Sequence, residues 1–160
     1  LATRSDADAS GTMRTWLEAV AYDGTAAHLV TALEVANASK GDSALTEVTA
    51  GGALWLAQST DAGKTHGLTV LGVHDSGHFE KRASATLSLP PQDLDRLGEV
   101  LSVSFGTTVQ LFGITPTAAI EAKGLPFDLG CLLPGLNRLS GNPDSGYWAP
   151  LGDYGSAPLP

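Results

Sequence analysis

The segment 124–160 constrains this chain more than any other part of its sequence. Its 37 residues hold six of the nine prolines and seven glycines, but only four charged residues. Proline interrupts helices and the central strands of sheets, because it has a fixed φ and no backbone N–H. The segment also carries four of the ten aromatic residues, whereas disordered segments are typically charged and poor in aromatics. We therefore expect an extended, irregular C-terminal arm whose apolar side chains must be buried.

The large apolar side chains of this C-terminal arm are candidate interface residues. Full burial of each one contributes about 1.5–3 kcal/mol, whether the arm lies on its own domain or on a neighbouring subunit. A fully extended arm of this length spans on the order of 100 Å, so we favour a neighbouring subunit as its binding surface. The candidates are Phe127, Leu132, Leu133, Leu136, Tyr147, Trp148 and Tyr154.

Length and composition exclude several classes of protein. A chain of 160 residues corresponds to one domain, and its net charge of −8 with only nine Lys and Arg residues excludes nucleic acid as a partner. The single cysteine, Cys131, excludes an intrachain disulfide and the common zinc sites built from two or four cysteines. Its apolar surroundings predict a buried structural thiol.

The spacing of apolar residues before the arm predicts an α+β fold. Helical spacing indicates several helices, although residues 12–22 also fit a strand, because Trp16, Val20 and Tyr22 share one face. The prolines at positions 90 and 91 are typical of a helix start, and an apolar stripe continues from there to Phe105. The predicted helices cover residues 12–22, 25–41, 91–105 and 116–123.

The sequence between these helices predicts a mainly antiparallel sheet, a meander with a clear hairpin at 66–89. The second half of that hairpin alternates apolar and polar residues around a turn at Asp75 to Gly77, which indicates one buried and one solvated face. We expect the helices to cover this sheet. The predicted organisation is a loose segment 1–11, a single domain 12–123 and the C-terminal arm 124–160.

Three histidines are the weak candidates for a metal site. His74 and His78 flank the hairpin turn, and His66 shares their face if the strand is regular. Three imidazoles are compatible with zinc and would allow a metal-dependent enzyme. Exposed polar residues beside a turn are the simpler interpretation, and we favour it.

No other motif predicts catalysis or a cofactor. The Gly63-Lys64-Thr65 triplet lacks the preceding glycine of a phosphate-binding loop, because Gln58 stands at that position. The G-x-S-x-G signature of hydrolases is also missing from the sequence. The second hypothesis is therefore a small-molecule-binding domain whose apolar pocket is lined by Trp16, Trp55 and Phe112.

The sequence favours a non-catalytic structural or accessory subunit of a larger assembly, such as a virion, a secretion machine or a membrane-associated complex. Its partners would be other protein subunits, identical or different, and any membrane contact would run through them. The charge-free run from Val100 to Ile120 contains too many polar residues for a transmembrane segment. No targeting segment is visible, and the first residue, Leu1, suggests a processed or trimmed N-terminus. The compartment stays unknown.

Overall fold

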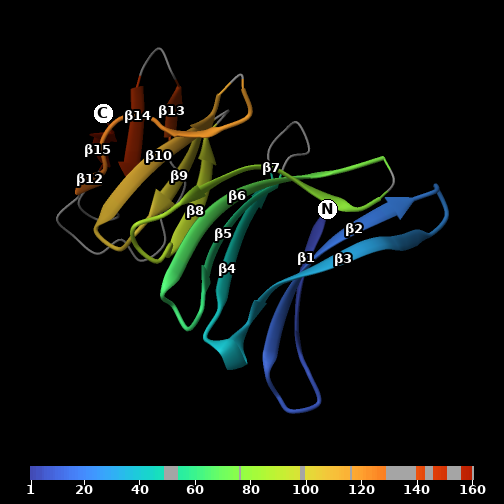
Figure 1. The fold of residues 1–160 in the computed structure, drawn as a ribbon. Helices are drawn as coiled ribbons and strands as arrows, with labels where there is room; N and C mark the ends of the chain where they lie inside the picture. Colours follow the sequence, from blue (N-terminus) through green and yellow to red (C-terminus); the bar gives the residue numbers. More distant parts are fainter. Residues whose placement is uncertain are drawn as a thin grey trace. The chain divides into compact units, whose positions relative to one another are not determined.

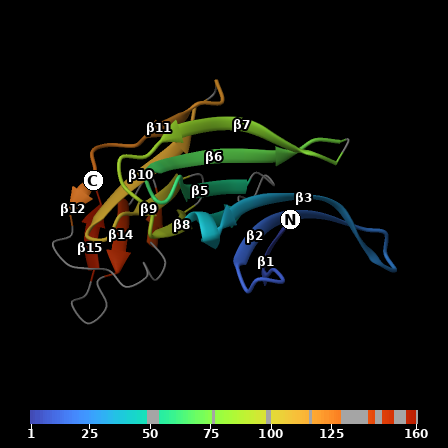
Figure 2. The same cartoon turned by 60° about the horizontal axis from the view of Figure 1, so that its bottom comes forward.

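The chain folds as antiparallel β-structure. The computed structural model describes residues 1–48, 54–75, 77–97, 100–115, 117–128, 140–142, 146–150 and 156–159. Strands account for most of the residues that the structure describes. The helical share is a single 3₁₀ turn, η1 (Ala38–Lys40), within the described residues. Two compact units, Leu1–Pro90 and Pro91–Pro160, make up the chain, and Figures 1 and 2 show their strands.

The first unit contains two antiparallel sheets. One has the order β1-β2-β3 and the other the order β4-β5-β6-β7, so each strand pairs with its neighbour in the sequence. The strands are β1 (Ala2–Ala7), β2 (Met13–Tyr22), β3 (Ala27–Asn37), β4 (Ser43–Val48), β5 (Leu54–Thr60), β6 (Thr65–Val73) and β7 (Phe79–Thr86).

A shared core joins the two sheets of this unit. Leu17 and Val35 from the first sheet pack in one buried cluster with residues of β5 and β6 from the second. The side-chain amide of Gln58 donates to the backbone oxygen of Val35 at 2.6 Å, so a polar contact also crosses between the sheets. The cluster consists of Leu17, Val35, Leu54, Leu56 and Leu71.

The second unit also contains two antiparallel sheets. The larger has the path β11-β10-β9-β8, with β12 paired to β10, and the smaller has the order β13-β14-β15. The bounds are β8 (Asp93–Leu97), β9 (Val100–Ser104), β10 (Thr108–Ile114), β11 (Ile120–Ala122), β12 (Phe127–Asp128), β13 (Ser140–Asn142), β14 (Gly146–Pro150) and β15 (Ser156–Leu159).

The predicted α+β fold with a helical cover is wrong. Residues 12–22 form the strand alternative, β2, and residues 25–41 form β3 with the short turn η1. Two bulges explain the second error, because β3 carries an extra residue at Val30 and another at Val35 relative to β2. Each extra residue shifts the two-residue alternation by one position, so the apolar residues of β3 recur at three- and four-residue spacings that imitate a helix.

The two later helices are also strands. The stretch after the paired prolines forms β8 and β9, which pair with each other from Asp93↔Ser104 to Leu97↔Val100. Residues 120–122 of the predicted 116–123 helix form β11, which pairs with β10. The first helical turn that Pro90 and Pro91 suggested is therefore overridden by the pairing of β8 with β9, since strand pairing depends on tertiary context.

The hairpin at 66–89 is present as β6 and β7. The two strands pair antiparallel from Gly67↔Thr86 to Val73↔Phe79, and the backbone N–H of His74 donates to the oxygen of His78 at 2.9 Å across the turn. On β7, Ala83 is buried while its neighbours Arg82 and Ser84 are exposed. The predicted boundaries at residues 12 and 124 stay predictions, although residues 2–7 pair with β2 as β1.

Candidate functional site

The end of the β2–β3 hairpin is a two-stranded ribbon. β1 pairs with β2 only as far as Glu18, so residues 19–31 of the hairpin pair only with one another. The ribbon is defined here as residues 19–33, which adds Ala32 and Leu33 opposite Glu18 and Leu17. Figure 1 shows this blue hairpin continuing past the end of β1. Two strands without further cover are marginally stable in water, so the surroundings of the ribbon determine what it can do.

One face of the ribbon carries an exposed apolar patch, defined here as Val20, Tyr22 and Leu29. Val20 lies directly opposite Leu29, and Tyr22 is two residues further along the same strand face. Their exposed fractions are 42%, 70% and 60%. Large apolar side chains clustered in this way on a soluble surface typically mark a contact site.

The opposite face borders a groove of about 340 Å³. Ala19 and Ala21 lie on that face, because they alternate with Val20 and Tyr22 along the strand. The turn after β6 forms the far wall, and a Cβ added at Gly77 would collide with Cγ1 of Val30, so the turn lies close against β3. The apolar lining residues are Leu1, Ala19, Val20, Ala21, Val30 and Val73, the polar ones are His74 and Asp75, and Gly77 also lines the groove. Val20 therefore borders both the patch and the groove.

The ribbon has very little charge. Between residues 19 and 33 the only Asp, Glu, Lys, Arg or His residues are Asp23 and His28, and His28 Nε2 lies 3.0 Å from Asp23 Oδ2. Asp23 Oδ1 also accepts the backbone N–H groups of Thr25 at 2.8 Å and Ala26 at 2.9 Å. The Ala26 and Thr25 hydrogen bonds, followed by the His28 contact, lower the pKa of Asp23. At the tip of the ribbon, Asp23 and His28 therefore pair with each other.

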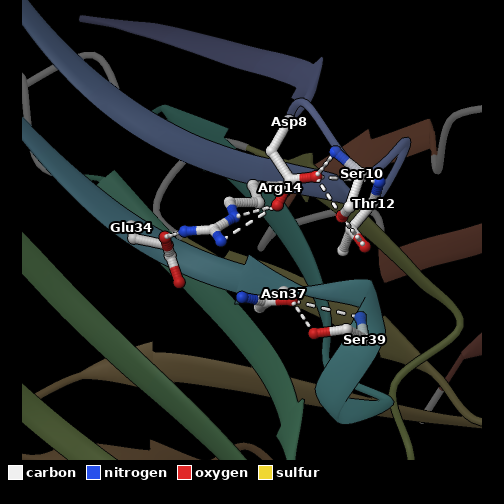
Figure 3. A network of polar contacts seen from close by, with 7 residues as sticks. All are labelled: Asp8, Ser10, Thr12, Arg14, Glu34, Asn37 and Ser39. Atoms are coloured by element: carbon white, nitrogen blue, oxygen red, sulfur yellow. Dashed lines mark hydrogen bonds and ion pairs between the residues drawn. The ribbon is translucent and has the colours of Figure 1, made fainter.

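A polar network lies at the other end of β2, where the chain turns from β1 (Figure 3). Asp8 Oδ1 accepts the hydroxyl of Ser10 at 2.5 Å and the N–H groups of Ser10 and Thr12 at 2.9 and 3.1 Å. Arg14 donates to Asp8 at 3.1 Å and to Glu34 at 3.2 Å. These donors, first the Ser10 hydroxyl, lower the pKa of Asp8 to about 2. The Asp8 carboxylate is therefore ionised near neutral pH. Its hydrogen bonds hold the turn between β1 and β2 in place.

The structure brings two of the three candidate histidines together. His74 and His78 stack with ring centroids 4.9 Å apart. His66 lies at the start of β6, eight residues before His74, where its Nδ1 is 2.9 Å from the hydroxyl of Ser59. Nowhere in the described part of the chain do three or more His, Cys, Asp or Glu residues group in a way that could hold a metal ion.

Most predicted residues of the C-terminal arm fall outside the described residues. Among them are Leu132, Leu133, Leu136 and Tyr154, as well as Cys131. Phe127 lies in β12 opposite Val109 and is half-buried. Tyr147 and Trp148 lie in β14, and the Trp148 side chain is 40% exposed. The proposed interface role of this set stays a prediction.

The three predicted pocket residues occupy separate places. Trp55 is a core residue of β5 with 2% exposure. Trp16 lies on β2 beneath the guanidinium of Arg4, whose Cζ is 4.4 Å from the ring centroid. Phe112 belongs to β10 of the second unit. None of the three lines the groove beside the ribbon.

Comparison with protein families finds no matching family model, and comparison with curated proteins finds no match either. No helix within the described ranges has the length and apolar character that spanning a membrane requires.

The sequence reasoning missed the patch because it assigned β3 to a helix. One signal was available: Val20 and Tyr22 share a strand face and precede the turn sequence Asp23-Gly24-Thr25. Read as a hairpin, this stretch would have placed apolar side chains on both faces of a ribbon with little charge.

Proposed function

We propose that this protein is a non-catalytic structural subunit that assembles with further copies of itself through the β2–β3 ribbon. The observation that carries the proposal is the concentration of exposed apolar side chains there. Twelve large apolar residues of the described chain are exposed, and five of them lie within the 15 residues of the ribbon. They are Val20, Tyr22, Leu29, Val30 and Leu33.

The surroundings of the ribbon support an interface role over a purely internal one. Toward the core, β2 and β3 pack on the second sheet through Leu17 and Val35. Beyond Glu18, Val20 and Leu29 remain 42% and 60% exposed within the first unit. Covering an exposed apolar surface with a partner removes it from water and so favours association.

The ionisable groups also support a non-catalytic role. Asp8, the carboxylate whose pKa is held furthest below its usual value, is surrounded by donors that keep it ionised. A general acid or base needs a pKa near the working pH. This arrangement supports a stabilising role for the polar network and leaves the ribbon as the main candidate surface.

Sedimentation velocity over a range of protein concentrations tests the proposal. We expect the wild-type chain to associate and the double variant Tyr22→Ser/Leu29→Ser to remain at the 16.4 kDa monomer mass. The matched control is Val48→Ser/Leu89→Ser, since Val48 and Leu89 are 43% and 47% exposed outside the ribbon. A wild-type chain that is monomeric at every concentration would overturn the proposal, as would equal loss of association in the control.

The C-terminal arm can be examined in the same experiment. Trp148 is the predicted interface residue of the arm that the structure describes as exposed, at 40%. If the arm makes a second contact between copies, Trp148→Ser weakens association, as the ribbon variant Tyr22→Ser/Leu29→Ser does. If the ribbon makes the contact alone, Trp148→Ser associates as the wild type does.

A further inference from the structure

We propose that His74 and His78, at the turn between β6 and β7, bind a single transition-metal ion of the kind that prefers imidazole ligands, with Zn²⁺ as the expected ion. This site is independent of the proposed function, because it uses the hairpin turn and not the exposed patch of the ribbon. Three observations support it: the backbone that holds the two histidines, the spacing of their rings and the charge around them.

The backbone holds the two histidines opposite each other. The last paired residues of the hairpin are Val73 and Phe79. One position further, the backbone N–H of His74 donates to the oxygen of His78 at 2.9 Å, and the N–H of Gly77 donates to the oxygen of His74 at 2.7 Å. The turn also lies close against β3 at Gly77. Because both side chains start from fixed backbone positions, less conformational freedom is lost when they bind one ion together.

The spacing of the two rings matches that of two imidazoles bound to one metal ion. The ring centroids lie 4.9 Å apart and the ring planes are inclined by 19°. With metal–nitrogen bonds of about 2.0–2.1 Å and bond angles between a right angle and the tetrahedral value, the centroids of two bound imidazoles lie about 4.5–5.2 Å apart. The rings therefore need little displacement. Rotation about χ2, which has a broad energy profile in histidine, turns a nitrogen of each ring toward the shared ion.

The chemistry of the pair favours one class of metal ion. Imidazole nitrogen is a ligand for Zn²⁺, Cu²⁺ and Ni²⁺, whereas Ca²⁺ and Mg²⁺ take oxygen ligands. Both histidines are exposed, so water molecules can fill the remaining positions around the ion. Among the described residues no third His, Cys, Asp or Glu completes a larger group. We therefore expect a weaker site than a structural zinc site with four protein ligands.

The charge of the molecule also favours a cation at this turn. The segment from His74 to His78 contains one carboxylate, Asp75, and no Lys or Arg. Asp75 is exposed next to His74, and the whole chain has a net charge of −8. An ion that approaches the turn is therefore attracted by a negative field.

Isothermal titration calorimetry of the chain with Zn²⁺ tests this proposal. His74→Ala and His78→Ala each remove one ligand. The matched control is His28→Ala, which removes an exposed histidine that contacts a carboxylate at the tip of the ribbon. All three positions are exposed, so the fold should tolerate each change, and circular dichroism verifies this. Titration with Ca²⁺ is the control for attraction by charge alone.

We expect the wild type and His28→Ala to bind one Zn²⁺ per chain. In His74→Ala and in His78→Ala the dissociation constant should rise by about tenfold or more, because loss of a residue that merely supports a metal ligand already costs about 10–100-fold. Ca²⁺ should not bind measurably. Substoichiometric Cu²⁺, a paramagnetic ion, should broaden the ring signals of His74 and His78 in nuclear magnetic resonance before that of His28.

Four results would overturn the proposal. They are a wild type that binds no Zn²⁺, unchanged affinity in either His74→Ala or His78→Ala, an equal loss of affinity in His28→Ala, and Ca²⁺ binding as tight as that of Zn²⁺. The proposed function is tested separately, since its variants lie in the ribbon and its sedimentation experiments are run with a chelator present.

Discussion

Asp8 shows how a single side chain can fix a turn. Its carboxylate receives the hydroxyl and N–H of Ser10, the N–H of Thr12 and the guanidinium of Arg14. All of these bonds favour the ionised form, which is why the pKa falls from 3.8 to about 2. The turn between β1 and β2 is therefore held by a charge that persists into strongly acidic solution.

This lowered pKa makes a prediction about acid stability. A folded-state pKa below the unfolded value stabilises the fold above pH 3.8, and this contribution disappears as pH falls through about 2. We expect Asp8→Asn to lower the melting temperature near neutral pH, and the difference from the wild type to vanish between these two pH values. Thermal unfolding of both proteins across that range provides the measurement. A difference that persists unchanged at the lowest pH would show that the carboxylate charge is not the cause.

Gly77 is a second residue whose role can be tested alone. Its φ of 85° lies in the left-handed region, and a Cβ there would collide with Val30 Cγ1. We expect Gly77→Ala to destabilise the first unit by more than about 1 kcal/mol in chemical denaturation. Gly63→Ala is the control, because Gly63 has a φ of 77° with nothing within 4 Å of an added Cβ. Equal losses for both variants would mean that contact between the turn and β3 contributes nothing.

At the scale of elements, packing between the sheets of the first unit depends on a few apolar residues. Leu17 is fully buried, and it is the β2 residue of the cluster with Leu54, Leu56 and Leu71. We expect Leu17→Ala to cost about 2–5 kcal/mol of unfolding free energy. Leu29→Ala, an apolar truncation on the exposed face of β3, should change stability by less than about 0.5 kcal/mol. Comparable losses in both variants would contradict the assignment of Leu29 to an exposed patch.

Some elements could be predicted from the sequence, and others could not. The hairpin of β6 and β7 was predictable, because the residues from Ala83 onward alternate regularly between apolar and polar, and the register shift at Arg82 comes before them. β3 was not, since the bulges at Val30 and Val35 break that alternation. β8 was mistaken for a helix because the prolines before it and its own aspartates are typical of a first helical turn. Here Asp93 and Asp95 accept the N–H of the following residue at 2.9 Å within a strand.

The candidate site depended on the same distinction. A patch built from Val20 and Leu29 exists only if β2 and β3 pair with each other. If residues 12–22 and 25–41 were the two predicted helices, Val20 and Leu29 would lie on different helices, and nothing in the sequence would place them side by side. The groove was beyond the reach of sequence reasoning, because it needs the turn at Gly77 to lie against Val30, more than 40 residues away in the chain.

For the whole molecule, an acidic chain with one neutral, apolar ribbon is suited to controlled self-assembly. The net charge of −8 keeps copies apart in most orientations, and the ribbon provides the surface through which they can meet. The whole ribbon and the groove beside it lie in the first unit.

Hydrogen–deuterium exchange at low and high protein concentration tests this account most directly. If copies meet through the ribbon, backbone amides in residues 19–33 exchange more slowly as concentration rises. The β1–β2 turn at Asp8 should exchange at the same rate in both samples. A ribbon that exchanges identically at both concentrations, or protection that appears only elsewhere in the chain, would contradict the account.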